Sequence, residues 1–106
     1  MTLNDDFAFQ LKAYEILHQR EYKAIPGRRF AFDFWISNGA TGKNLLVELQ
    51  GGVWMKRAGH NTGKGIQRDC LKLNLATLNE YAVMHFTTQD VEDGTAIYMV
   101  KKYLEK

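Results

Sequence analysis

The sequence predicts an α/β domain in which helices flank a mixed four-stranded sheet. A helix-like segment at residues 3–18 precedes three short strand-like segments that are separated by turn residues. A second helix-like segment then joins the third strand to a fourth, which is the kind of connection that parallel strands require. One more helix closes the chain. The expected order is therefore helix, three strands, helix, strand, helix.

The first helix and the first strand are indicated by apolar spacing and by a turn signal. Asn4 or Asp5 is the candidate cap of the helix over residues 3–18. Residues 21–25 form a short predicted strand, because Pro26 and Gly27 directly after them are a strong turn signal. The large side chains at helical intervals in the first segment are Leu3, Phe7, Leu11, Tyr14 and His18.

The second and third strands are predicted on either side of a glycine-rich hairpin loop at residues 38–43. Residues 45–50 begin with Leu-Leu-Val, which predicts burial on both faces and a central place in the sheet. Gly51 and Gly52 end this strand. Alternation in residues 29–36 predicts a strand with an apolar face of Phe30, Phe32, Phe34 and Ile36, and a mixed face of Arg29, Ala31, Asp33 and Trp35.

The second half of the chain is predicted to contain a loop, two helices and the last strand. The loop covers residues 53–65, and a helix over residues 64–80 follows from Ile66, Cys70, Leu73 and Thr77 at helical spacing. Residues 82–87 form the fourth strand. Thr88 is placed to cap a turn or short helix, and the final helix carries Ala96, Val100 and Tyr103.

Composition and length indicate one globular domain over residues 1–106. The chain is 45% hydrophobic and 25% charged, as in ordinary globular proteins. Cys70 is the single cysteine, so an internal disulfide is excluded and a cytosolic setting is natural. Polar residues interrupt the N-terminal apolar pattern and no apolar stretch is long enough to span a bilayer. We therefore expect a cytoplasmic protein that does not bind membranes.

Charge distribution is more informative than the net charge of +2. Residues 49–68 contain no acidic residue. Such a segment either contacts phosphates or is a solvated basic loop, and charge alone does not distinguish the two. The cationic and histidine side chains in it are Lys56, Arg57, His60, Lys64 and Arg68.

A pair of carboxylates is the candidate reactive centre. Glu48 and Gln50 are two residues apart on one strand and therefore share a face. Asp33 lies on the mixed face of the preceding strand, so pairing through the hairpin brings it close to Glu48. Two adjacent carboxylates repel unless a cation lies between them, and oxygen ligands suit Mg²⁺ or Mn²⁺. Two unconnected surface acids are the alternative, which the spacing leaves open.

Four stretches together resemble a known family: residues 28–34 (RRFAFDF), 47–54 (VELQGGVW), 59–65 (GHNTGKG) and 69–76 (DCLKLNLA). From about residue 21 onward the chain looks like small phage- and bacterium-encoded PD-(D/E)XK nucleases, related to the VRR-NUC and very-short-patch-repair-like groups. The resemblance implies a restriction-endonuclease-like core of order αβββαβ. The order that we predict from periodicity agrees with it.

The resemblance also implies roles for individual residues. Asp33 matches the metal-ligating aspartate, Glu48 matches the acid of the motif, and the backbone carbonyl of Leu49 is a further metal ligand. Gln50 stands where a lysine is usual, and glutamine can only orient the attacking water by hydrogen bonding. Lys72 on the following helix either supplies the missing positive charge or is a solvated helix residue.

Further residues have two open interpretations each. An additional acid is expected from Glu21, with Glu15 as the rival, unless both face solvent. His60 either contacts the scissile phosphate or is an inert loop histidine, and Trp54 either stacks on a base or packs under the loop. Arg28 and Arg29 either hold phosphates or form salt bridges with Asp69 or Glu48. His18 and His85 are expected to be packing residues.

The expected function is that of a DNA endonuclease dependent on Mg²⁺ or Mn²⁺, with its natural setting in a bacterial or phage-infected cell. A domain of this size has no separate sequence-reading module. We therefore expect selectivity for junctions, flaps or nicked duplexes in replication, repair or recombination, with a homodimer presenting two sites to two strands. The alternatives are a non-catalytic nucleic-acid-binding module on the same fold and an interaction domain without a nucleic-acid role.

Overall fold

The computed structural model of the chain describes residues 1–51 and 63–106. Its elements follow the predicted order, and the turn or short helix expected at Thr88 is a short helix. The elements are α1 (Leu3–Ala13), β1 (His18–Tyr22), β2 (Phe32–Asn38), β3 (Lys43–Gln50), α3 (Gly63–Leu78), β4 (Ala82–Thr87), α4 (Thr88–Glu92) and α5 (Thr95–Glu105).

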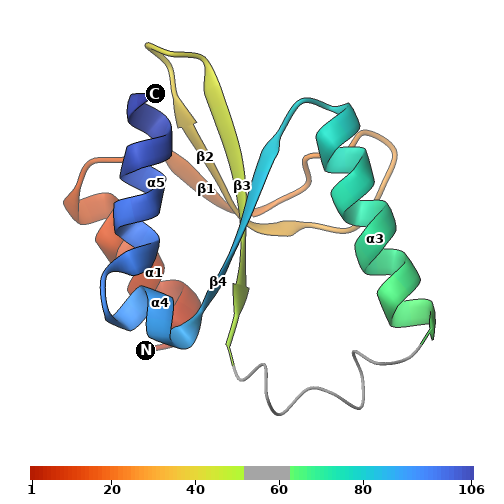
Figure 1. Ribbon diagram of the computed structural model, residues 1–106, viewed down its shortest axis with the longest axis horizontal. Helices are drawn as coiled ribbons and strands as arrows, with labels where there is room; N and C mark the ends of the chain where they lie inside the picture. The colour runs from red at the N-terminus through yellow and green to blue at the C-terminus, as the bar shows by residue number, and fades with distance from the viewer. Residues whose placement is uncertain (52–62) are drawn as a thin grey trace.

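The sheet is mixed, as predicted, and its strands lie in the order β1-β2-β3-β4. β1 with β2 and β2 with β3 pair antiparallel, whereas β3 and β4 pair parallel. Figure 1 shows α1, α4 and α5 on one face of the sheet and α3 on the other. The central position of β3 is confirmed, since its consecutive residues Leu45, Leu46 and Val47 are all fully buried. The protein is therefore an α/β structure with helices flanking a mixed four-stranded sheet.

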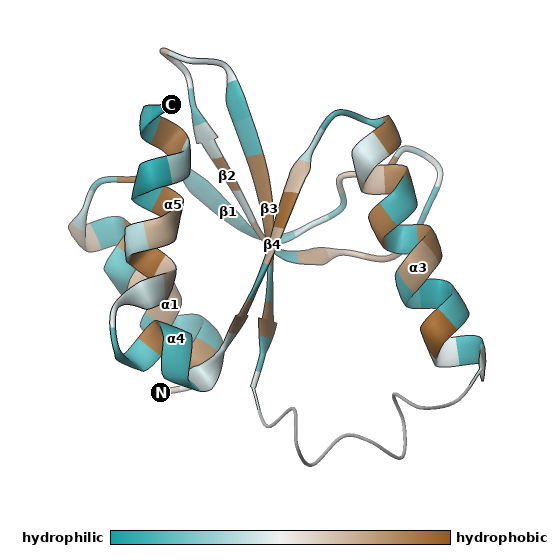
Figure 2. Cartoon of the chain, viewed as in Figure 1, coloured by the Kyte–Doolittle hydropathy of each residue, from teal (hydrophilic) through white to brown (hydrophobic). Residues whose placement is uncertain are grey.

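Apolar side chains form a separate core on each face of the sheet. The larger core includes Phe7 of α1 and Phe34 of β2, whose rings meet edge to face with centroids 5.1 Å apart. The smaller core, under α3, contains Ile25, Phe32, Leu46 and Ala76. Figure 2 shows hydrophobic segments along β3 and β4, between the two helical layers. Ala76 is the only buried residue of α3, so this helix covers its face of the sheet less tightly than α1 and α5 cover theirs.

The first helix is shorter than predicted and is capped by a different residue. It ends at Ala13, and Glu15 takes a left-handed conformation with a φ of 57°, which cannot continue a helix. Thr2, not Asn4 or Asp5, is the N-cap. Its side chain accepts the Asp5 N–H and the Asp5 carboxylate accepts the Thr2 N–H, a capping box.

The first strand lies three residues earlier than predicted, at His18–Tyr22 instead of 21–25. Its position is determined by pairing with β2, from His18 opposite Ile36 to Tyr22 opposite Phe32. The turn at Pro26 and Gly27 is present, with Gly27 at a φ of 78°. β2 begins at Phe32, so the predicted start at residue 29 is wrong. Phe32 also belongs to the smaller core, whereas Phe34 and Ile36 belong to the larger, so the single apolar face expected for this strand is interrupted.

The C-terminal helices also differ from the prediction. Thr87, not Thr88, is the N-cap of α4, in a capping box with Asp90. Gly94 separates α4 from α5 because it has a φ of 87°, a conformation that glycine adopts readily. Among the described residues, no helix is long and apolar enough to cross a membrane.

Candidate active site

A pocket of about 300 Å³ lies between the sheet and α3. It contains Asp33 and Glu48, the two acids that the sequence places together. The residues that line it are Phe32, Asp33, Glu48, Leu49, Gln50, Asp69, Lys72, Leu73 and His85.

Asp33 lies where β2 and β3 separate. The regular pairs of these strands run from Asn38 opposite Lys43 to Phe34 opposite Val47. One residue further along β2, a carboxylate oxygen (Oδ2) of Asp33 accepts the backbone N–H of Leu49 at 2.7 Å. The Asp33 carboxylate thus accepts an N–H group that would bond to a backbone carbonyl in a regular strand pair. This hydrogen bond holds the Asp33 side chain beside Glu48. The regular alternation of side chains along β2 ends at Asp33, where the strands separate. For this reason Phe32 packs in a different core from Phe34 and Ile36.

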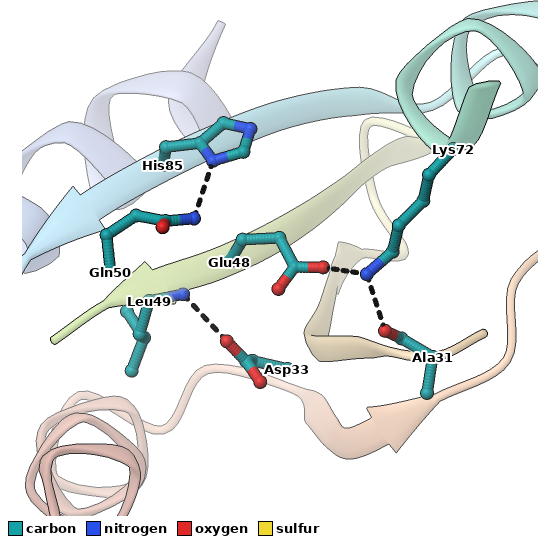
Figure 3. Close-up of polar contacts among 7 residues, drawn as sticks. All are labelled: Ala31, Asp33, Glu48, Leu49, Gln50, Lys72 and His85. Carbon is teal, nitrogen blue, oxygen red and sulfur yellow. Dashed lines mark hydrogen bonds and ion pairs between the residues drawn. The ribbon is translucent and has the colours of Figure 1, made fainter. Parts of the chain in front are cut away.

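Glu48 and Lys72 form a largely buried ion pair. Their side chains are 15% and 18% exposed, respectively. The Lys72 ammonium donates to Glu48 Oε1 and to the carbonyl oxygen of Ala31, the latter at 2.8 Å, as Figure 3 shows. It also lies 4.5 Å from the centroid of the Phe32 ring. These contacts place the Lys72 ammonium beside Glu48 in the pocket, so Lys72 is not a solvated helix residue.

The environment of Glu48 disfavours its charge. Burial raises the pKa of the Glu48 carboxyl above its ordinary value, and the neighbouring Asp33 acts in the same direction. Lys72 opposes the shift through its hydrogen bond and its charge. In Figure 3 the second oxygen of Glu48 turns toward Asp33. A positive charge between Asp33 and Glu48 would therefore stabilise the ionised form of Glu48.

The donor set suits a hard divalent cation held by few protein ligands. Oxygen atoms are the ligands that Mg²⁺ prefers, and Mg²⁺ commonly uses one or two carboxylates together with water. Within residues 1–51 and 63–106, no group of three or more His, Cys, Asp or Glu side chains is arranged to hold a metal. A cation at this site would thus depend on Asp33 and Glu48, with the Leu49 carbonyl as the implied third ligand.

Gln50 and His85 form the wall of the pocket opposite Lys72. Gln50 Nε2 lies 3.1 Å from His85 Nδ1, and His85 on β4 is in register with Glu48 on β3. His85 is exposed in the pocket, so the expectation that it is a packing residue is wrong. Once β3 and β4 are paired in parallel, alternation along β4 brings the His85 side chain to the face of Glu48 and Gln50.

The two candidates for an additional acid lie outside the pocket lining. Glu21 and Glu15 are both exposed, and both have a positive φ, of 52° and 57°. Neither glutamate lines the pocket, so neither Glu21 nor Glu15 is the additional acid that the sequence predicted at the site. Asp69, which the sequence suggested only as a salt-bridge partner, does line it.

The structure describes some of the basic residues that the sequence predicts to contact DNA. Arg28 and Arg29 are exposed in the connection before β2, and Lys64 and Arg68 are exposed on α3. In the part of the chain that the structure describes, the ion pairs are Arg20–Asp5 and Lys72–Glu48, so Arg28 and Arg29 do not pair with Asp69 or Glu48. The remaining predictions, for Trp54, Lys56, Arg57 and His60, fall outside the described residues.

Comparison of the chain with protein-family models, curated proteins and solved structures finds no match. The case for a function therefore depends on the geometry of the pocket and on the resemblance of the motifs.

Proposed function

We propose that the protein is a divalent-metal-dependent DNA endonuclease of the PD-(D/E)XK type, on a restriction-endonuclease-like core. One observation carries the proposal. Asp33 and Glu48 share a pocket at the point where β2 and β3 separate, and the ammonium of Lys72 reaches the same pocket from α3. Burial and the neighbouring Asp33 both disfavour the charge of Glu48, and an ionisable group perturbed in this way in a pocket is typical of a functional site.

In this proposal Asp33, Glu48 and the Leu49 carbonyl hold Mg²⁺ or Mn²⁺. When bound, the cation would polarise a phosphoryl oxygen and lower the pKa of a water molecule. Gln50 orients the attacking water through its amide oxygen, because its amide nitrogen is engaged with His85. Lys72 supplies the positive charge that the motif lysine would otherwise bring, and stabilises negative charge that develops on the phosphate.

In this proposal exposed basic residues hold the DNA. Arg28 and Arg29 before β2, and Lys64 and Arg68 on α3, are exposed and available to phosphates. We also expect Lys56, Arg57 and His60, from the basic segment of the sequence, to contact phosphates. We also propose selectivity for junctions, flaps or nicked duplexes. A homodimer would present two such sites.

A second candidate is a non-catalytic nucleic-acid-binding module. It is favoured by a specific observation: Lys72 already compensates Glu48 within the protein, and a glutamine stands where the motif lysine is usual. In that case Asp33 and Glu48 would be acids retained without chemistry.

A cleavage assay separates the two candidates. Supercoiled plasmid and a branched junction are incubated with the protein in Mg²⁺, in Mn²⁺ or with a chelator. We expect metal-dependent cleavage that Asp33→Asn and Glu48→Gln each reduce at least a hundredfold, whereas Glu92→Gln on the exposed surface of α4 leaves it unchanged. Cleavage that survives the first two substitutions would refute the site, and binding without any cleavage would favour the second candidate.

A further inference from the structure

The hydrogen bond between Gln50 and His85 fixes the imidazole in one tautomer. Gln50 Nε2 lies 3.1 Å from His85 Nδ1, and an amide nitrogen is a donor only. His85 Nδ1 therefore accepts, and the ring hydrogen of the neutral imidazole must be on Nε2. A second histidine of the chain has the opposite arrangement, because His18 Nδ1 lies 2.8 Å from the carbonyl oxygen of Ile16 and must donate to it.

The donor on His85 is directed away from Gln50 and is accessible. Figure 3 shows Gln50 and His85 on one side of Glu48 and Lys72 on the other, with the second ring nitrogen of His85 pointing away from Gln50. His85 is exposed and its strand β4 is the edge of the sheet in the described part of the chain. His85 thus presents an accessible N–H group at the rim of the pocket, on the side of Glu48 opposite the ammonium.

An anionic ligand needs such a donor in this pocket. Three lining residues, Asp33, Glu48 and Asp69, are acidic and repel anions. Among the described residues of the lining, Lys72 is the cation, and its ammonium is engaged with Glu48 and with the Ala31 carbonyl. Among the described residues His85 is in no ion pair, so its Nε2–H can donate to an anionic oxygen without first leaving a partner.

We propose that His85 Nε2–H donates to a non-bridging oxygen of a phosphodiester bound at the pocket, and that Gln50 is the positioning residue that keeps the hydrogen on Nε2. This inference deepens the proposed function and rests on it for the identity of the ligand. Gln50 then has two roles that are compatible: its nitrogen fixes His85 while its oxygen remains available to water.

The tautomer is tested first, on the full ¹⁵N-labelled chain by long-range ¹⁵N–¹H correlation at alkaline pH, where histidine is neutral. We expect the ring hydrogen of His85 on Nε2 and that of His18 on Nδ1, with assignments from His85→Ala and His18→Ala. In Gln50→Glu the carboxylate can only accept, so the ring hydrogen of His85 should move to Nδ1. A His85 hydrogen on Nδ1 in the wild type would overturn the proposal.

Ligand binding is tested with dimethyl phosphate, a minimal phosphodiester, and with a junction oligonucleotide in chelator. We expect dimethyl phosphate to shift the His85 Nε2 resonance in the wild type but not in Gln50→Glu. We also expect His85→Ala to weaken DNA binding about tenfold, as for a hydrogen bond to a charged group, while His18→Ala has no effect. Circular dichroism verifies that each variant is folded.

The outcomes separate this inference from the proposed function. If the wild type cleaves DNA and His85→Ala binds and cleaves it equally well, the role of His85 is refuted and the nuclease stands. If dimethyl phosphate shifts His85 and Gln50→Glu abolishes the shift, but no DNA is cleaved, the phosphodiester site stands and the nuclease fails. If His85 responds to neither ligand and no DNA is cleaved, both are refuted.

Discussion

Replacement of Lys72 by methionine tests the electrostatic arrangement of the pocket. Methionine keeps an apolar side chain of similar length over Phe32 but removes the ammonium from Glu48. Glu48 would then be a carboxylate with 15% of its side chain exposed, beside Asp33 and without its cation. We expect the variant to fold and to be less stable at neutral pH.

The magnitude follows from the burial of the pair. Loss of an exposed ion pair changes stability by about 0–1 kcal/mol, whereas removing one partner of a fully buried pair costs about 3–5 kcal/mol. The side chains here are 18% and 15% exposed, between those cases but closer to the buried one. We expect a loss of about 2–3 kcal/mol in the free energy of unfolding at neutral pH.

The loss should depend on pH in a defined direction. Burial raises the pKa of Glu48, so the folded protein binds this proton more tightly than the unfolded chain does. The protonated Glu48 therefore stabilises the folded state at pH values below the ordinary glutamate pKa. This contribution is lost as the pH rises through the raised pKa of the folded state. Without Lys72 that pKa rises further, so the difference between variant and wild type should be largest at neutral pH and should shrink on acidification.

Urea denaturation of wild type and Lys72→Met at neutral and mildly acidic pH measures this effect. Lys64→Met, an exposed site on the same helix, is the matched control and should change stability by less than about 0.5 kcal/mol. The double variant Glu48→Gln, Lys72→Met should recover much of the loss. If Lys72→Met lost the same free energy of unfolding at both pH values, or no more than Lys64→Met, Lys72 would not be the cation that stabilises ionised Glu48.

Three further substitutions test other parts of the structure by urea denaturation. Glu48→Gln should cost less stability at neutral pH than Lys72→Met, because the amide oxygen can still accept from the Lys72 ammonium while burial no longer disfavours a charge at position 48, and a larger loss would contradict this. Thr2→Ala should cost about 1 kcal/mol, since Thr2 accepts the Asp5 N–H at 3.1 Å in the capping box, and no change would refute the cap. Leu46→Ala should cost about 2–5 kcal/mol, because Leu46 is fully buried under α3, and a loss below about 1 kcal/mol would show that α3 does not cover it.

The fold could be predicted from the sequence where the local pattern of apolar residues agrees with the burial and pairing of each element in the structure. The consecutive apolar residues of β3 indicated burial on both faces, and the helical crossover indicated a parallel fourth strand. β1 was misplaced because its residues are polar at an edge of the sheet, and pairing with β2 alone determines its position. The end of α1 was missed because apolar spacing continues past Ala13, while the left-handed Glu15 leaves no periodic signal.

The candidate site was predictable only in part. Alternation along two paired strands was enough to bring Asp33 and Glu48 together, and resemblance singled out Lys72. His85 was assigned to packing because its place beside Gln50 depends on the register between β3 and β4, which are separated by a helix in the sequence. Asp69 was considered only as a salt-bridge partner because its proximity depends on how α3 lies over the sheet.

Manganese binding tests the central claim most directly, namely that Asp33 and Glu48 together hold a divalent cation. The electron paramagnetic resonance signal of free Mn²⁺ is followed as the protein is added. We expect the wild type and Glu92→Gln to bind Mn²⁺ with the same affinity, and Asp33→Asn and Glu48→Gln each to abolish binding. Undiminished Mn²⁺ binding in either of these two variants, or no binding by the wild type, would contradict the assignment of this pocket as a metal-dependent active site.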